Sequence, residues 1–130
     1  MGGLKTYIRA TALICALAAP LAARAGTDIP DDPLHFFATC AGRLSALMEH
    51  QWLVDGPASE VTKARRAAVL EVVEAMMPPG SETRVMAWRV EAKAAHAMLL
   101  GQSRQGDPAA MARAARRAQA LETACTAYLS

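Results

Sequence analysis

The chain carries three histidines and three cysteines, which are the side chains with the most potential for chemistry. They are His35, His50, His96, Cys15, Cys40 and Cys125. No two histidines have the spacing of a helical metal pair, and none lies beside a cysteine as in a haem-attachment motif. The sequence also lacks a Ser-His-Asp set, a pair of catalytic carboxylates and a glycine-rich phosphate loop. We therefore predict a non-enzymatic protein without a cofactor.

Residues 1–25 have the pattern of a cleaved secretory signal peptide. Lys5 and Arg9 precede an apolar run over residues 10–23, and small residues stand at positions −3 and −1 of a cleavage site before Gly26. A retained membrane anchor is the alternative, but about fourteen apolar residues are too few for a helix that needs roughly twenty to cross a membrane. We expect a periplasmic or secreted bacterial protein with no stable membrane insertion after cleavage.

Export favours a disulfide between Cys40 and Cys125. These are the two cysteines left after cleavage, and disulfides persist outside the cytosol. Their spacing is unlike C-x-x-C, so a redox-active dithiol or a thiolate metal site is the weaker interpretation. In the chain-entropy model a bridge this long in sequence stabilises the fold by about 4 kcal/mol.

The charge balance argues against nucleic acid as a partner. The 130-residue sequence has 14 Lys and Arg against 12 Asp and Glu. Three of the cations, Lys5, Arg9 and Arg24, lie in the predicted signal peptide, so eleven cations face twelve anions after cleavage. A protein this close to neutral has no broad cationic surface for nucleic acid or for an acidic membrane.

Composition and hydrophobic period predict one all-α domain. Hydrophobic residues make up 53% of the chain and aromatic residues only 5%. Helix N-caps are expected at Asp32, Ser59, Ser81 and Asp107. Helix ends are expected near Val54, Pro78 and Gly101, with the last helix reaching Tyr128. This leaves an N-terminal extension at residues 26–32 and a four-helix bundle over residues 33–130.

Short connections favour an up-down-up-down bundle in which the first and last helices are antiparallel neighbours. Cys40 near the start of one and Cys125 near the end of the other are at the same height only in that arrangement. The same register predicts that Phe37 faces Tyr128, Leu44 faces Leu121, Leu47 faces Ala118, and Arg43 forms an ion pair with Glu122. The small residues Gly42 and Ala124 are expected to let these two helices approach closely.

His50 and His96 are the weak candidates for a metal or ligand site in the bundle interior. Each lies roughly 20 to 25 Å along its helix, and the first and third helices should be parallel. Both also lie at the rim of an apolar stripe beside an arginine, so solvated histidines are the competing interpretation. Arg65 falls inside the apolar stripe of the second helix, and Glu49 is its candidate partner.

The apolar stripes predict the core. On the first helix the apolar arc, which includes Trp52, covers about 160°, so this helix should pack against two neighbours. The expected core residues are Val61, Ala68, Val69, Val72 and Met76 on the second helix, and Val85, Trp88, Ala92, Ala95 and Leu99 on the third. Leu70, Met77, Met86, Val90 and Leu100 lie off these stripes and are candidates for a contact patch.

These observations favour an exported binding or accessory protein that acts through a helix face on a protein partner. One alternative is a ligand or metal carrier that uses the bundle interior with His50 and His96. Another is an acid-stress or periplasmic chaperone, by analogy with other small exported helical proteins that have one disulfide. A small enzyme is disfavoured because no catalytic group can be named.

Overall fold

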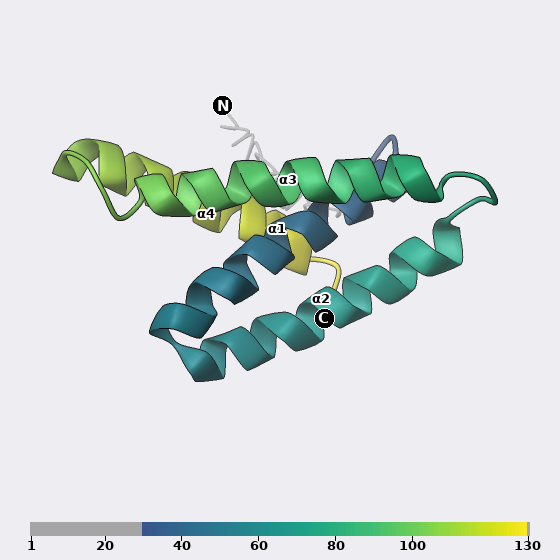
Figure 1. Ribbon diagram of the computed structural model, residues 1–130, viewed down its shortest axis with the longest axis horizontal. Helices are drawn as coiled ribbons and strands as arrows, with labels where there is room; N and C mark the ends of the chain where they lie inside the picture. The colour runs from purple at the N-terminus through teal and green to yellow at the C-terminus, as the bar shows by residue number, and fades with distance from the viewer. Residues whose placement is uncertain (1–29, 130) are drawn as a thin grey trace, which may run out of the picture.

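The computed structural model describes residues 30–129, and this part of the chain is all-helical. The helices are α1 (Pro33–Val54), α2 (Gly56–Met76), α3 (Glu82–Gln102) and α4 (Pro108–Thr126) (Figure 1). The prediction of four helices without strands is confirmed for these residues. The predicted signal peptide at 1–25 and the extension at 26–29 lie outside the described residues.

Aspartate caps begin α1 and α4 as predicted. The carboxylate of Asp32 accepts a hydrogen bond from the backbone N–H of His35, and Asp107 accepts from the N–H groups of Ala109 and Ala110. A proline follows each aspartate, where its missing N–H costs no helical hydrogen bond. The two Asp-Pro pairs therefore fix where these helices start.

The start of α2 differs from the prediction. Its cap is Asp55, whose carboxylate accepts from the N–H of Ala58, and α2 begins at Gly56. Ser59 is buried instead, and its hydroxyl donates to the carbonyl of Met48 on α1 at 2.9 Å. One residue, Asp55, is enough to reverse the chain between the two helices. α2 therefore begins closer to the end of α1 than predicted. α3 ends at Gln102, one residue after the stop predicted at Gly101.

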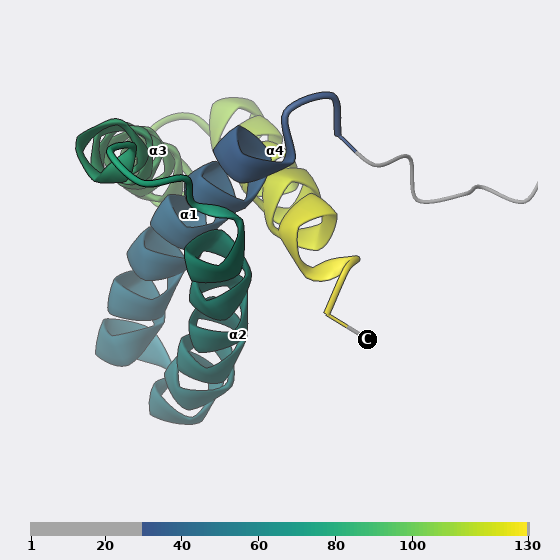
Figure 2. The ribbon, with the colours of Figure 1, turned by 90° about the vertical axis from the view of Figure 1, so that its right-hand side faces the viewer.

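α1 is the central helix, and each of the other helices packs against it (Figure 2). α2 runs antiparallel along one side, as the bond from Arg66 Nε to Ser45 Oγ at 2.6 Å shows near its middle. α3 crosses another side in the same general direction as α1, with the His35 and Trp88 rings 4.7 Å apart near their starts. α4 returns along α3. The contact between α4 and α1 is the smallest of these, so it gives only weak support to the predicted up-down-up-down bundle.

The disulfide between Cys40 and Cys125 is confirmed. Their Cα atoms are 5.4 Å apart, and both residues are fully buried. Phe37 faces Tyr128 as the register predicts, with ring centroids 5.7 Å apart. Leu47 packs against a cluster that contains Ala118, also as expected. The pairing of Leu44 with Leu121 stays a prediction.

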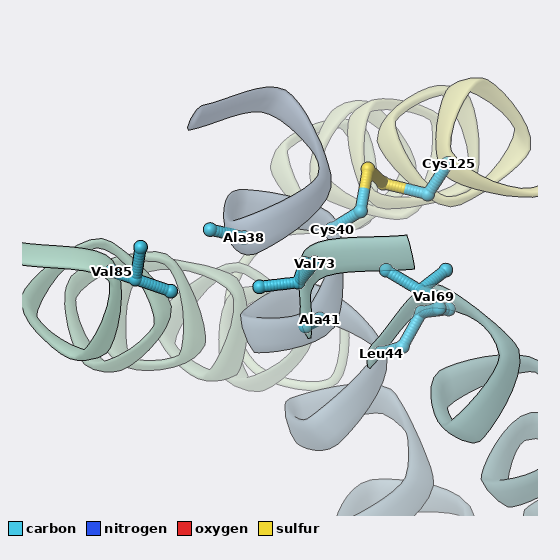
Figure 3. Close-up of a cluster of buried hydrophobic side chains, with 8 residues drawn as sticks. All are labelled: Ala38, Cys40, Ala41, Leu44, Val69, Val73, Val85 and Cys125. Carbon is cyan, nitrogen blue, oxygen red and sulfur yellow. A yellow bond between two sulfur atoms is a disulfide. The ribbon is translucent and has the colours of Figure 1, made fainter. Parts of the chain in front are cut away.

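The main core surrounds α1 and is small (Figure 3). Its buried members are Ala38, Cys40, Ala41, Leu44, Val69, Val73, Val85 and Cys125. A second cluster joins Ala46, Leu100 and Ala118. These side chains come from all four helices, so the core ties every element to α1.

The predicted core stripe of α2 is partly wrong. Val69 is buried, but Val61 and Met76 are exposed, whereas Leu70 and Met77 pack against the core. Buried Ser59 and Thr62 face α1 near the turn. Because both side chains are polar, the spacing of apolar residues could not identify them as part of the buried face. Leu100, also expected off the core, is buried between α3 and α4, and only Met86 and Val90 of the predicted contact patch are exposed.

Gly42 lets α1 and α3 approach closely. A Cβ atom at this position would overlap the carbonyl oxygen of Arg89 and lie 3.0 Å from the Cβ of Ala92. Both neighbours belong to α3, so the prediction that Gly42 serves the contact between the first and fourth helices is wrong. No side chain larger than hydrogen fits this crossing without a shift of the helices.

We expect Gly42→Ala to lower the free energy of unfolding by about 1–3 kcal/mol, because the methyl group pushes α1 and α3 apart. Gly101→Ala is the matched control, since it is also helical and nothing lies within 4 Å of its Cβ position. It should add up to about 1 kcal/mol through helix propensity. Urea unfolding followed by circular dichroism measures both values. Equal effects of the two substitutions would contradict the close approach.

Replacing Cys40 and Cys125 together by alanine should lower the free energy of unfolding by about 4 kcal/mol, because the unfolded chain is then no longer closed into a loop. Urea unfolding of the oxidised chain and of the double variant gives the difference. Alkylation of the denatured, unreduced chain followed by mass spectrometry is the control, and it should label neither cysteine. Unchanged stability in the double variant would show that the bridge does not restrain the unfolded state.

Candidate functional site

The structure places the two predicted site histidines in different environments. His50 is half-buried on α1 and forms no hydrogen bond or ion pair with other described residues. His96 is only 2% exposed, and its Nε2 lies 2.8 Å from Oε1 of Glu122 on α4. The interpretation of His96 as a solvated rim residue is therefore wrong. α4 packs over that rim of α3 and buries His96.

Within residues 30–129, no group of three or more His, Cys, Asp or Glu side chains is placed to hold a metal ion. His96 is instead part of a buried pair with Glu122, and its Nδ1 is buried without a hydrogen-bond partner in the described part of the chain. The residues of 30–129 thus leave one polar atom of the interior without a hydrogen bond.

Two predicted ion pairs are replaced by other contacts. Glu122 binds His96 and not Arg43, whose Nη1 approaches Sγ of Cys125 at 4.0 Å. Burial of the guanidinium, and next to it the positive charge of Arg117, lower the pKa of Arg43 from its ordinary value. The carboxylate of Glu49 accepts from Lys93 of α3, so the predicted partnership of Glu49 with Arg65 is also wrong.

Arg65 is exposed because α2 turns a different face toward α1. The neighbouring Arg66 occupies the interface, where its Nε donates to Ser45. A rotation of about 100° separates consecutive helical residues, so a small change in the buried face exchanges the roles of the two arginines. Nothing in the described part of the chain assigns Arg65 a role beyond the solvated surface.

A pocket of about 480 Å³ opens between α1, α3 and α4. Its polar lining residues are His35, Thr39 and Arg43 from α1, Glu91, His96 and Gln102 from α3, and Arg117 from α4. Trp88 and other apolar side chains of α3 and α4 form the rest of the wall. Sequence reasoning did not find this site, because Arg43 and Arg117 are far apart in the chain and only tertiary packing brings them to one cavity.

The corner between α1 and α2 presents a second feature, an apolar tip made of Trp52, Leu53, Val54 and Val61. The first three are 76%, 79% and 59% exposed, and Val61 is 52% exposed. Figure 1 shows α1 and α2 diverging from α3 toward this corner. Trp52 was expected in the buried arc of α1. It is exposed because α2 is the one described helix that accompanies α1 to its end.

A smaller cavity of about 280 Å³ lies beside the tip, between α1 and α2. Met48 and Trp52 provide its apolar walls, and Glu49, Glu60 and Lys63 provide its charged rim. Lys63 and Glu60 also form an ion pair on the surface of α2 at 3.5 Å. The tip therefore combines an apolar centre with a polar edge.

Comparison of the chain with protein-family models, with curated proteins and with solved structures found no match. Every helix within residues 30–129 falls short of the length and hydrophobicity that a membrane span requires. The pocket and the apolar tip are the two candidate functional sites of the described residues.

Removing the carboxylate of Glu122 should destabilise the fold, because it leaves Nε2 of buried His96 without a partner. We expect Glu122→Ala to lower the free energy of unfolding by about 1–3 kcal/mol. Glu122→Gln keeps a carbonyl oxygen that accepts from the imidazole, so its loss should be smaller. Urea unfolding of both variants at neutral pH measures the difference, and equal losses would show that the hydrogen bond contributes nothing.

Proposed function

We propose that this chain is an exported, non-enzymatic binding protein that acts on a protein partner through the apolar tip. The observation that carries the proposal is the exposure of three consecutive large apolar side chains, Trp52, Leu53 and Val54. Export to the periplasm or the extracellular space is part of the proposal, supported by the signal-peptide pattern of residues 1–25 and by the disulfide.

The exposure of the tip is a property of its sequence as well as of the fold. Consecutive helical residues lie about 100° apart, so the side chains of residues 52–54 span about 200° around α1. A single neighbouring helix covers a narrower sector, and α2 therefore leaves most of this surface in water. A buried tryptophan removes about 150–250 Å² from solvent, which corresponds to about 4–6 kcal/mol of gross hydrophobic free energy. A partner that covers the tip gains this term.

The tip is also held in place before a partner arrives. Asp55 alone connects the helices, with its N–H bonded to the carbonyl of Gln51 and its carboxylate bonded to Ala58. The hydroxyl of Thr62 donates to the side chain of Gln51, which joins α1 and α2 one turn from the corner. A surface that is already ordered loses little entropy on binding, so more of the burial energy appears as affinity.

The rim of the tip favours a protein over an anionic membrane as the partner. Glu49 and Glu60 at this rim are paired with Lys93 and Lys63, and Asp55 adds one carboxylate at the corner. The rim is therefore not the basic surface that anionic lipids attract. An apolar centre with a polar rim is the usual anatomy of a protein interface. We infer a partner that inserts an apolar side chain beside Trp52.

The predicted arrangement of the helices belongs to the same proposal. We infer an up-down-up-down order in which α1 and α4 are antiparallel neighbours at the end that carries the disulfide. The bridge and the ring contact of Phe37 with Tyr128 support this arrangement. The contacts of α4 with α1 reach Ala46 and Leu47, and the tip beyond them stays free for a partner.

A photo-crosslinking amino acid at position 53, in the producing cell, should give one discrete protein adduct, because Leu53 lies at the centre of the proposed interface. The same amino acid at position 86 on α3 is the matched control, since Met86 is exposed and apolar but outside the tip. Gel electrophoresis and mass spectrometry identify the adduct. The proposal fails if position 53 gives no adduct, a lipid adduct, or the same products as position 86.

The double variant Trp52→Ala, Leu53→Ala should weaken binding of the purified chain to that partner by at least 30-fold, since a central interface tryptophan contributes about 2 kcal/mol or more. Met86→Ala, Val90→Ala removes a similar exposed apolar surface from α3 and should leave the affinity unchanged. Calorimetric titration measures both. Equal affinities of the two double variants would place the interface elsewhere.

A further inference from the structure

We propose that the pocket between α1, α3 and α4 binds a small organic anion that has an apolar body, with Arg43 and Arg117 as the groups that recognise its charge. This site is separate from the apolar tip, and the inference does not rest on the protein partner. The ligand class follows from three properties of the pocket wall: unpaired positive charge, an unsatisfied buried nitrogen and an aromatic surface.

Two guanidinium groups line the cavity without a carboxylate partner. Neither Arg43 nor Arg117 forms an ion pair within residues 30–129, and the polar contact of Arg43 is with Sγ of Cys125 at 4.0 Å. Burial of the guanidinium and, second to it, the positive charge of Arg117 lower the pKa of Arg43. An anion between them replaces this repulsion by two charge-assisted hydrogen bonds.

His96 is another residue of this wall, and one of its ring nitrogens is buried without a partner among the described residues. It lines the pocket although it is 2% exposed, and its Nδ1 is the buried side-chain atom that has no hydrogen-bond partner in the described part of the chain. Buried polar atoms are normally satisfied. A protonated imidazole donates from Nδ1 to an anion while Nε2 donates to Glu122, and a neutral imidazole accepts from a hydroxyl group of the ligand at Nδ1.

The apolar part of the pocket wall indicates that the ligand has an apolar body as well as a charge. Trp88, Leu99 and Leu121 line the cavity, and the Trp88 ring is supported by His35 at 4.7 Å between centroids. The volume of about 480 Å³ lies within the range of small-molecule sites, roughly 300–1,000 Å³. A bare inorganic anion leaves this surface uncovered, so the ligand is a carboxylate, sulfonate or phosphate on a body about the size of one or two rings.

Glu91 is the carboxylate in the lining of this pocket, and it opposes anion binding. It is exposed and forms no ion pair with either arginine or with any other described residue. Its negative charge weakens the attraction between the guanidiniums and an anion. This gives the site a built-in test, because removing the charge of Glu91 should strengthen the binding that removal of an arginine weakens.

The probes are 8-anilinonaphthalene-1-sulfonate, an organic anion of suitable size, and N-phenyl-1-naphthylamine, which has the same ring system without the sulfonate. Both are titrated by fluorescence into the purified chain with its disulfide intact. Arg117→Gln should weaken binding of the sulfonate roughly tenfold, the change expected for one charge-assisted hydrogen bond. Arg116→Gln is the matched control, an exposed arginine outside the pocket lining, and should change nothing.

Two further variants locate the probe and test the sign of the charge effect. In Trp52→Phe the remaining tryptophan is Trp88, so bound sulfonate should quench its emission by energy transfer. Glu91→Gln should tighten sulfonate binding by roughly two- to fivefold without affecting the neutral probe, since a like charge near the site is removed. Circular dichroism checks that each variant has the helical content of the parent chain.

The inference is overturned by any of three results. Arg117→Gln and Arg116→Gln could weaken the sulfonate equally, which would reduce the effect to overall charge. The neutral probe could bind as tightly as the sulfonate, which would make the site purely apolar. Sulfonate binding could be lost in Trp52→Ala, Leu53→Ala, which would place the probe on the apolar tip. None of these outcomes bears on whether the tip binds a protein.

Discussion

The backbone of α3 lies against the backbone of α1 at Gly42, and the positions of α4 and of the disulfide follow from this crossing. α4 returns along α3, joined to it by the pair of His96 with Glu122 and by the cluster that contains Leu100 and Ala118. This return brings Cys125 to Cys40, and the bridge closes a ring of contacts from α1 through α3 and α4 back to α1. α2 stands outside the ring and depends on α1 alone for its main packing.

The two proposed recognition surfaces use different parts of α1. Its first half provides Arg43 to the pocket and Cys40 to the bridge, in the region where three helices meet. Its last turn has α2 as the neighbour and carries Trp52 and Leu53 into solvent. The two parts of α1 differ because they have different numbers of neighbours. Where several helices surround α1, they enclose a pocket with fixed charges. Where α2 is the main neighbour, apolar side chains of α1 stay exposed. The proposed ligand site and the proposed protein interface therefore do not overlap on α1.

Local signals in the sequence predicted the helices and the bridge. Asp-Pro caps act on neighbouring residues, and the two cysteines that follow the predicted signal peptide have only each other as a covalent partner. Side-chain environments were predicted less well. A regular bundle gives each helix two neighbours, whereas α1 has three and α2 has one main neighbour. Val61 and Trp52 are therefore exposed and His96 is buried, each against expectation. The pocket was not predictable, since the meeting of Arg43 with Arg117 depends on how far α4 returns along α3.

The bridge has a topological consequence for cleavage of the chain. Cys40 lies in α1 and Cys125 in α4, so all three connections between helices fall inside the covalent loop of sequence separation 85. A protease that cuts one of these connections divides the polypeptide but leaves the two pieces joined through sulfur. Loss of a fragment requires either two cuts or reduction of a bridge whose cysteines are fully buried. The fold thus retains all four helices after a single nick in any one of these connections.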